Sequence, residues 1–308
     1  MKSIKISLEG TPNDYSSSLL PLVIQHLGYR IEWCTSSHAD LKILGPFQKQ
    51  SRFKSFVPKP LRPLFAPKKR RSDLLTLFHT QENIRHNSIS ANFSLSFDLG
   101  VEDNNHFRLP YWMEMIDWAH EGITTNTNPR YGRLMSLDRL MQPLGEGFKG
   151  RAQKIAFITS HLNEPRKLLY QHLNSLMTIE GFGPYFDQNI RSHHQSSFTK
   201  YTLLQEYAFN LCPENSLYPG YVTEKIPEAF YAGCIPLAWV DTNVICDFNP
   251  KAIINLMPLV HENFSSFKEI LNSPDAFKEI SQNSLLLKKP SLEPLKVFML
   301  EILRQARA

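Results

Sequence analysis

Apolar residues alternate with polar ones in short segments of the amino-terminal half, and this pattern predicts strands separated by a helix. Ile4, Ile6 and Leu8 fall on one side of a strand over residues 2–9, because side chains of a strand point alternately to its two faces. Serines and Gly28 bracket a predicted helix over residues 16–27, since serine favours helix starts and glycine favours helix ends. Further strands are predicted over residues 29–34, 40–44, 74–78 and 93–99.

A second alternation of strands and helices occupies the carboxy-terminal half. Strands are predicted over residues 154–159, 207–212, 235–239 and 253–256, and helices over 165–176 and 225–233. Apolar residues at helical spacing over 294–307 predict a terminal helix that docks on the protein. Strands that alternate with helices are typical of mostly parallel sheets with helices on both faces.

The length of 308 residues suits two such domains. We predict a first α/β domain over residues 1–149 and a second over residues 150–308, which includes the terminal helix. Open parallel sheets bind ligands at the carboxyl ends of their strands. Two Rossmann-like domains that face each other across a cleft are therefore expected to hold a ligand in that cleft.

Gly145, Gly147 and Gly150 have the spacing of the dinucleotide-binding fingerprint. That fingerprint requires a strand before it and a helix after it, because the helix N-terminus holds the pyrophosphate. Here a predicted strand follows the glycines instead. We interpret the segment as a flexible linker between the two domains.

Composition excludes several classes of protein. Hydrophobic residues make up 42% of the chain, which is too many for wholesale disorder, and no run of 18 apolar residues predicts a transmembrane helix. The four cysteines form no CxxC pair, which argues against a disulfide framework or a zinc site. We expect a cytoplasmic protein, with peripheral association at the inner membrane surface as the alternative.

Positive charge is concentrated in residues 47–71, which hold nine Lys and Arg residues, four prolines and no Asp or Glu. Basic and aromatic side chains together favour binding to an anionic membrane surface, and a solvated loop is the equally weighted alternative. We expect no nucleic-acid partner, because the charge is confined to this one segment and no RNA- or DNA-binding module is visible.

The polar stretch over residues 209–226 runs from a predicted strand through a loop into a predicted helix. Thr223 is a candidate N-cap, and free backbone N–H groups at a helix start favour a diphosphate. Lys225 adds a positive charge, Glu224 can accept hydrogen bonds from two ribose hydroxyls, and Asn215 offers neutral hydrogen bonds. The simpler alternative is an ordinary capped helix on the surface.

The sequence FNLCPENSLYPGYVTEKIPEAFYAGCIP, followed by DFNPK at residues 247–251, resembles the signature of glycosyltransferase family 10, the α-1,3/4-fucosyltransferases. Residues 40–47, 78–83, 92–110 and 154–175 also resemble family segments, in the same order. The resemblance implies the GT-B architecture. It further implies inverting transfer of L-fucose from GDP-β-L-fucose to a glycan or lipid-linked oligosaccharide, in α-1,3 or α-1,4 linkage to a GlcNAc-type acceptor.

The resemblance also implies roles for single residues. Glu224 would bind the ribose hydroxyls, and Lys225 and Arg166 the phosphates of GDP. Asn215 and Tyr221 match motif positions that line the donor pocket. The position of Arg166 at the start of a predicted helix suits this role, because its planar guanidinium grips phosphate oxygens in pairs.

The segment FHTQEN at residues 78–83 resembles the part of the family that carries the catalytic base. This implies that Glu82 takes the proton from the attacking sugar hydroxyl, and a loop glutamate that caps a turn is the simpler alternative. No Asp-x-Asp metal motif occurs, so we expect no metal and no cofactor beyond the GDP-fucose substrate, with protein cations stabilising the leaving group.

Departures from the family pattern leave the donor sugar open. Pro213 replaces an aromatic residue, and Val240 and Asp241 replace a glycine and its small neighbour. A transferase for a different GDP-linked sugar is therefore the first alternative. A non-catalytic protein that binds nucleotides or nucleic acid is the second.

Overall fold

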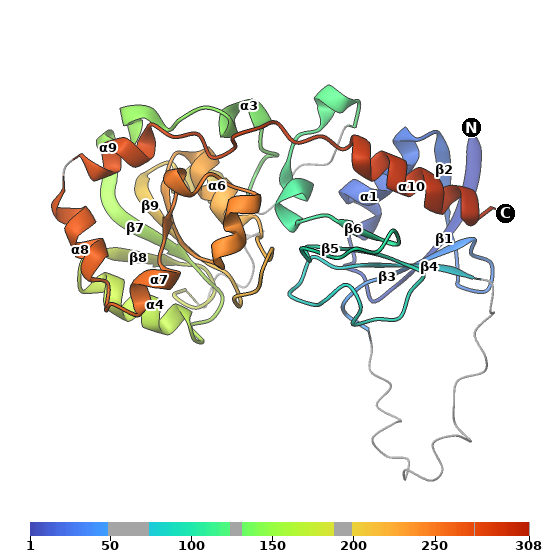
Figure 1. Ribbon diagram of the computed structural model, residues 1–308, viewed down its shortest axis with the longest axis horizontal. Coiled ribbons are helices and arrows are strands. Elements are labelled where there is room, and N and C mark those ends of the chain that lie inside the picture. Colours follow the sequence, from blue (N-terminus) through green and yellow to red (C-terminus); the bar gives the residue numbers. More distant parts are fainter. Residues whose placement is uncertain (49–73, 124–130, 188–198, 274, 308) are drawn as a thin grey trace, which may run out of the picture. The chain divides into compact units, whose positions relative to one another are not determined.

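The computed structural model describes residues 1–48, 74–123, 131–187, 199–273 and 275–307, which form two compact units (Figure 1). Unit 1 comprises residues 1–109, 121–125 and 291–308, and unit 2 comprises residues 110–120 and 126–290. Apart from its first two positions, the basic segment 47–71 lies outside the described residues. Its predicted membrane role therefore stays a prediction.

Unit 1 is built on a parallel sheet of six strands in the order β2-β1-β3-β4-β5-β6. All residues of β3 and β5 are buried, as expected for parallel strands that are covered on both faces. The sequence pattern predicted all of these strands except the short β6. The strands are β1 (Lys2–Glu9), β2 (Tyr29–Trp33), β3 (Leu41–Leu44), β4 (Leu75–His79), β5 (Phe93–Ser96) and β6 (His106–Arg108).

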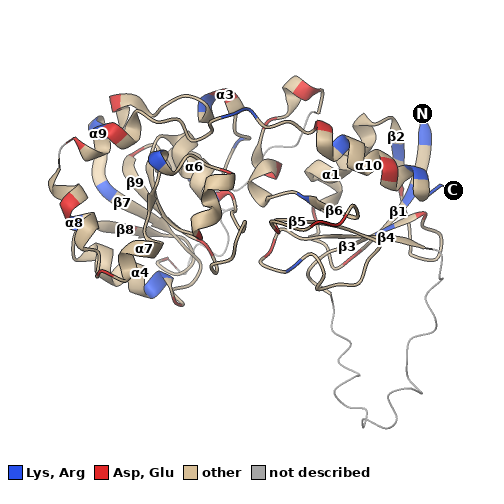
Figure 2. Cartoon of the chain, in the orientation of Figure 1, with Lys and Arg blue, Asp and Glu red and all other residues tan. Residues whose placement is uncertain are grey.

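Helices α1 (Leu19–His26) and α10 (Glu293–Gln305) pack beside each other in unit 1 (Figure 1). Phe298 of α10 contacts the rings of Phe93 and Phe107, with centroids 5.9 and 5.5 Å away. Acidic and basic residues stand together on the same helix (Figure 2). Helix α10 thus completes the core of unit 1, and the prediction that it belongs to the second domain is wrong.

Unit 2 contains a parallel sheet of five strands in the order β11-β10-β9-β7-β8. The chain runs from β7 to the edge strand β8 and then returns to β9 on the other side of β7. The direction of winding therefore reverses between β7 and β9, which is where open α/β sheets bind ligands. The strands are β7 (Ala152–Ile158), β8 (Ile179–Phe182), β9 (Tyr207–Pro213), β10 (Ile235–Trp239) and β11 (Ile254–Asn255).

Helices surround the sheet of unit 2 (Figure 1). The buried side chains of Phe157, Phe209 and Phe267 belong to its apolar core. No helix in the described part of the chain has the length and apolar character needed to cross a membrane. The helices of this unit are α3 (Leu137–Leu140), α4 (Arg166–Asn174), α5 (Lys200–Leu204), α6 (Lys225–Ala232), α7 (Met257–Val260), α8 (Ser265–Asn272) and α9 (Ala276–Ser281).

The units divide at a different place from the predicted boundary between residues 149 and 150. The chain first enters unit 2 at residue 110, and residues 131–149 also belong to unit 2. The glycine-containing segment is a 3-10 helix, η5 (Gly145–Gly150), and its Phe148 is buried in the core of unit 2. Our interpretation of this segment as a flexible linker is wrong, since the apolar anchor of Phe148 fixes it.

Candidate functional site

A pocket of about 180 Å³ lies at the carboxyl ends of β7 and β9 in unit 2. The first residues of α4, α5 and α6 contribute to its wall, as does the 3-10 helix η3 (Tyr111–Met115). It occupies the point of reversed winding, where a ligand is expected. Its charged lining residues are Arg166, Lys200, Glu224, Lys225 and Glu228.

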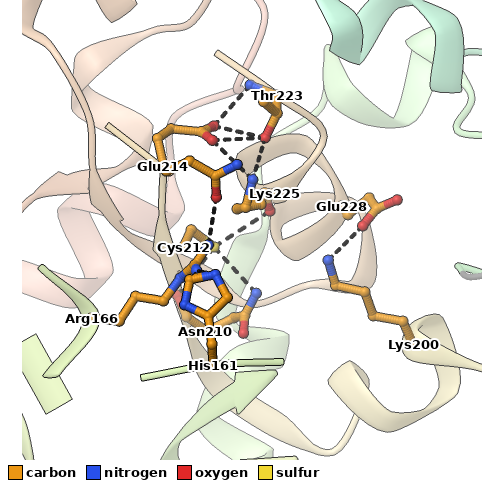
Figure 3. Close-up of polar contacts among 10 residues, drawn as sticks. His161, Arg166, Lys200, Asn210, Cys212, Glu214, Thr223, Lys225 and Glu228 are labelled. Carbon is orange, nitrogen blue, oxygen red and sulfur yellow. Dashed lines mark hydrogen bonds and ion pairs between the residues drawn. The ribbon is translucent and has the colours of Figure 1, made fainter. Parts of the chain in front are cut away.

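The loop between β9 and α6 is organised around the carboxylate of Glu214, which is fully buried. This carboxylate accepts hydrogen bonds from the backbone N–H of Thr223 at 2.8 Å and from its hydroxyl at 2.9 Å. It also accepts one from Lys225 Nζ at 2.9 Å (Figure 3). Buried charges require such pairing, so Glu214 ties the two ends of the loop together.

Thr223 does not act as the predicted N-cap. The residue before the first turn of α6 is Glu224, and the hydroxyl of Thr223 points to Glu214 instead. The prediction failed because a buried carboxylate nine residues earlier competes for that hydroxyl. The start of α6 still faces the pocket through Glu224 and Lys225.

Lys225 is held as a cation inside the pocket. Burial alone would lower the pKa of its ammonium group, but the nearby carboxylates of Glu214 and Glu224 outweigh burial and raise the pKa. An ammonium group that stays protonated at the start of a helix suits an anionic ligand, because the helix N-terminus adds its own positive potential.

Glu224 stays ionised at neutral pH. Burial acts to raise the pKa of this carboxyl, but the cations of Lys225 and Lys200 outweigh it and lower the pKa from 4.5 to about 2. An ionised carboxylate accepts hydrogen bonds and donates none. The side chain at this position can therefore receive two neighbouring hydroxyl groups of a ligand.

Arg166 begins α4 and is almost fully buried. Its Nη2 donates to Asn215 Oδ1 at 2.6 Å, and its Nη1 lies 3.0 Å from Nδ1 of His161. Burial and the adjacent guanidinium lower the pKa of His161, so this imidazole is neutral at pH 7. Both of these partners of Arg166 are neutral, which leaves its positive charge available to a ligand.

Of the five predicted donor-site residues, three line the pocket and two do not. Arg166, Glu224 and Lys225 are brought together there. Asn215 is exposed and accepts a hydrogen bond from Arg166, and Tyr221 is buried in the loop, with its N–H bonded to the carbonyl of Tyr218 at 3.0 Å.

Sequence reasoning missed four polar residues at or beside this pocket. Lys200 Nζ donates to Glu228 Oε2 at 2.6 Å, and both side chains are largely buried (Figure 3). Glu214 supports the loop, and Asn210 lines the pocket from the middle of β9. A spacing signal was present for Glu228, because it follows Glu224 by four residues and so shares its helix face.

Glu82 lies in unit 1, in the loop that follows β4. Its side chain is half-buried, and its backbone N–H donates to Thr80 Oγ1 at 3.1 Å. The same loop is tied down at Asp98, which accepts hydrogen bonds from the N–H of His86 at 2.7 Å and from Arg85 Nη1 at 3.3 Å. The loop conformation is thus fixed by buried polar contacts, and the catalytic role of Glu82 stays a prediction.

Comparison with known sequences identifies the part of the chain that holds this pocket. Residues 148–279 match the family model for the carboxy-terminal domain of glycosyltransferase family 10 (fucosyltransferase). These residues belong to glycosyltransferase family 10. The family 10 domain therefore contains all of the pocket residues discussed above except those of η3.

Two relatives match parts of the chain. An alpha-(1,3)-fucosyltransferase of Helicobacter pylori is 29% identical over 213 residues, which are 64% of this chain and 42% of that protein. A putative fucosyltransferase of Acanthamoeba polyphaga mimivirus is 32% identical over 84 residues, which are 23% of this chain and 14% of that protein. The chain thus aligns with less than half the length of each relative.

Solved structures extend the likeness beyond the family 10 domain. A crystal structure of an alpha-1,3-fucosyltransferase with GDP-fucose superposes with a TM-score of 0.69 at 21% identity, covering 98% of this chain and 91% of that one. Another, with GDP, gives a TM-score of 0.69 at 22% identity. The fold is therefore that of GT-B enzymes, with two Rossmann-like domains, as predicted.

Proposed function

We propose that this protein is a fucosyltransferase that moves L-fucose from GDP-β-L-fucose to a hydroxyl group of a glycan acceptor. The observation that carries the proposal is the arrangement of Arg166, Glu224 and Lys225 around one pocket inside the family 10 domain. Two cations suit a diphosphate, and an ionised carboxylate suits the two hydroxyls of a ribose. The names of the relatives support fucose as the sugar.

The reaction is a single displacement at the anomeric carbon. The acceptor oxygen forms a bond to that carbon while the bond from the carbon to the β-phosphate oxygen breaks, so a β-linked donor gives an α-linked product. Glu82 takes the acceptor's proton as general base. Arg166, Lys225 and the N-terminus of α6 stabilise the charge that develops on the departing GDP.

We further propose that these protein cations make a metal ion unnecessary. Arg166 carries a charge that its hydrogen-bonded neighbours His161 and Asn215 do not neutralise. Lys225 lines the same pocket as a cation, since the carboxylates of Glu214 and Glu224 keep its ammonium group protonated. The acceptor is proposed to be a GlcNAc-type glycan or a lipid-linked oligosaccharide, with an α-1,3 or α-1,4 linkage.

The test is to incubate the protein with GDP-fucose and a panel of oligosaccharide acceptors in the presence of EDTA. We expect a deoxyhexose mass increment on at least one acceptor, at a rate that added Mn²⁺ does not change. Transfer that occurs only with Mn²⁺ would contradict the metal-free mechanism alone. Absence of transfer together with absence of GDP binding would contradict the function.

A transferase for another GDP-linked sugar is the alternative that a specific observation favours. Val240 is buried directly after β10, and Asp241 accepts a hydrogen bond from Asn243 N at 2.9 Å as the N-cap of the next helix. These two residues depart from the family pattern where the resemblance implies a small residue beside the donor. A competition between GDP-fucose and GDP-mannose under equal concentrations decides between the two sugars.

A further inference from the structure

One residue that lines the pocket has a buried polar atom without a hydrogen-bond partner among the described residues. Asn210 lies on β9, is only 3% exposed, and lines the pocket. Its amide Nδ2 donates to Cys212 Sγ at 3.2 Å, whereas its Oδ1 is buried and accepts no hydrogen bond from the part of the chain that is described. Buried polar atoms are nearly always hydrogen-bonded, and an exception calls for a functional explanation.

The orientation of this amide follows from its neighbour. Burial raises the pKa of the Cys212 thiol, so the sulfur keeps its proton at neutral pH. The thiol has carbonyl acceptors at 3.4 Å, those of Lys225 and of Asn210 itself. The sulfur therefore presents a lone pair to the amide, and Nδ2 turns towards the sulfur while Oδ1 turns away from it (Figure 3).

The surrounding lining limits what can bind to Oδ1. An amide oxygen only accepts hydrogen bonds, and a diphosphate at neutral pH offers no proton for one. The phosphates have cationic partners at Arg166 and Lys225 in the same pocket. The partner of Oδ1 must be a hydroxyl or an N–H group, and a nucleotide-sugar carries such groups on the sugar, the ribose and the base.

We propose that Asn210 is a ligand-binding residue of this pocket, whose Oδ1 accepts a hydrogen bond from an O–H or N–H group of the bound nucleotide-sugar. The proposal rests on the proposed function, because that function supplies the ligand. It adds a specificity-determining contact from β9 to those on the loop and on helices α4 and α6. Without ligand, Oδ1 is buried and has no partner in the described ranges of the chain, so the proposed hydrogen bond forms only when the ligand binds.

The experiment compares wild type with Asn210→Leu, which keeps the branched shape and the number of heavy atoms of the side chain and removes the acceptor. Binding of GDP and of GDP-fucose is measured by calorimetry, and the melting temperature is measured without ligand. We expect about tenfold weaker binding of GDP-fucose. We also expect a melting temperature no lower than that of wild type, because the substitution removes an unsatisfied buried oxygen.

Two further variants serve as a replacement for Asn210→Leu and as a control for packing. Asn210→Ala serves if the leucine variant does not fold. Cys234→Ala shortens a buried side chain of the same unit that does not line the pocket, so it should bind GDP-fucose as wild type does. Equal weakening by Cys234→Ala would show that packing, not the acceptor, matters and would overturn the proposal.

Comparing GDP with GDP-fucose shows which part of the ligand donates the hydrogen bond to Asn210 Oδ1. Weaker binding of GDP-fucose alone places the contact on the transferred sugar, and equal weakening of both ligands places it on the nucleoside. Both results support the proposal. If wild type binds and Asn210→Leu binds both ligands within about twofold of it, the proposal is overturned while the proposed function stands. If wild type binds neither ligand, the proposed function itself fails.

Discussion

Glu82 is the residue that unit 1 contributes to the proposed reaction, as general base. Replacing it with glutamine preserves shape and hydrogen bonding but removes the ability to take a proton. Glu82→Gln should lower the transfer rate by about 10²–10⁴-fold, with GDP affinity nearly unchanged, because the donor pocket is built from unit 2. Initial rates and GDP calorimetry are the two measurements.

The control for this variant is Glu102→Gln, an exposed carboxylate in the same unit. It should transfer fucose at the wild-type rate. If Glu82→Gln keeps most of its turnover, another group is the base and the assignment of Glu82 is wrong.

Glu224 provides a test based on pH. The pKa of its carboxyl is lowered from 4.5 to about 2 in the folded protein, so between these values the unfolded chain binds more protons than the folded one. Its contribution to stability is therefore complete above about pH 4.5 and is lost as the pH falls towards 2. The variant Glu224→Gln has no such group to protonate.

We expect the urea midpoint of wild type to fall more steeply between pH 5 and 3 than that of Glu224→Gln. The gap between the two proteins should close as the pH falls. Parallel decline of the two midpoints would show that Glu224 is not held as an anion by Lys225 and Lys200.

At the scale of elements, the loop between β9 and α6 depends on one buried ion pair. Glu214 is fully buried and accepts hydrogen bonds from Thr223 and Lys225. Glu214→Gln leaves the ammonium group of Lys225 without its hydrogen-bonded ion-pair partner in a largely buried place, which should lower the free energy of unfolding by about 3 kcal/mol. Urea denaturation measures this loss, with the exposed Glu269→Gln as the matched control.

Hydrogen exchange separates a local effect from a general one. Peptides that cover residues 214–225 should lose protection in Glu214→Gln before peptides of β7 or β8 do. A loss spread evenly over unit 2, or no change in stability at all, would contradict the role of Glu214 as the organiser of this loop.

The pattern of apolar residues predicted the long strands well, and the reason is physical. Strands such as β1 (Lys2–Glu9) and β9 (Tyr207–Pro213) are long enough to show either alternation or a continuous apolar run. Strand β6 (His106–Arg108) has three residues, all half-buried, and shows no pattern. Its existence depends on pairing with β5, which no local signal reveals.

The site was predicted in part for a similar reason. Residues that form a contiguous motif, such as Glu224 and Lys225, were found because the chain places them together. Asn210 and Lys200 line the pocket from a strand and a helix. The sequence around each shows only the pattern of an ordinary structural element, so it does not reveal a site residue. The hydroxyl of Thr223 bonds to Glu214, which is a tertiary contact. Local helix propensity does not predict such a contact.

At the scale of the whole molecule, the chain order and the compact units do not coincide. Helix α10 follows all of unit 2 in the sequence but completes unit 1. Lys296 on this helix pairs with Glu121 at 3.1 Å, and Glu121 accepts the N–H of Leu292 at 3.1 Å. The sequence predicted a docking helix from its apolar spacing, but the surface that receives it, with α1, Phe93 and Phe107, lies far earlier in the chain.

The packing of α10 leads to a prediction about unit 1. Met299 is fully buried on this helix, whereas Val297 is 66% exposed. Met299→Ala should destabilise unit 1 by about 2–5 kcal/mol, seen as faster hydrogen exchange in peptides of β5 and β6. Val297→Ala should stay close to wild type. If faster exchange appears first in unit 2, the division into these two units is wrong.

The central claim is that the family 10 domain binds guanosine diphosphate through the cations of its pocket. The most direct measurement is calorimetric titration of GDP into wild type and into the double variant Arg166→Gln, Lys225→Gln, with Lys167→Gln as an exposed control on the same helix as Arg166. Circular dichroism confirms that each protein is folded. We predict that the double variant binds at least about 10²-fold more weakly, while Lys167→Gln binds as wild type does. A folded double variant that binds GDP as tightly as wild type would contradict the account.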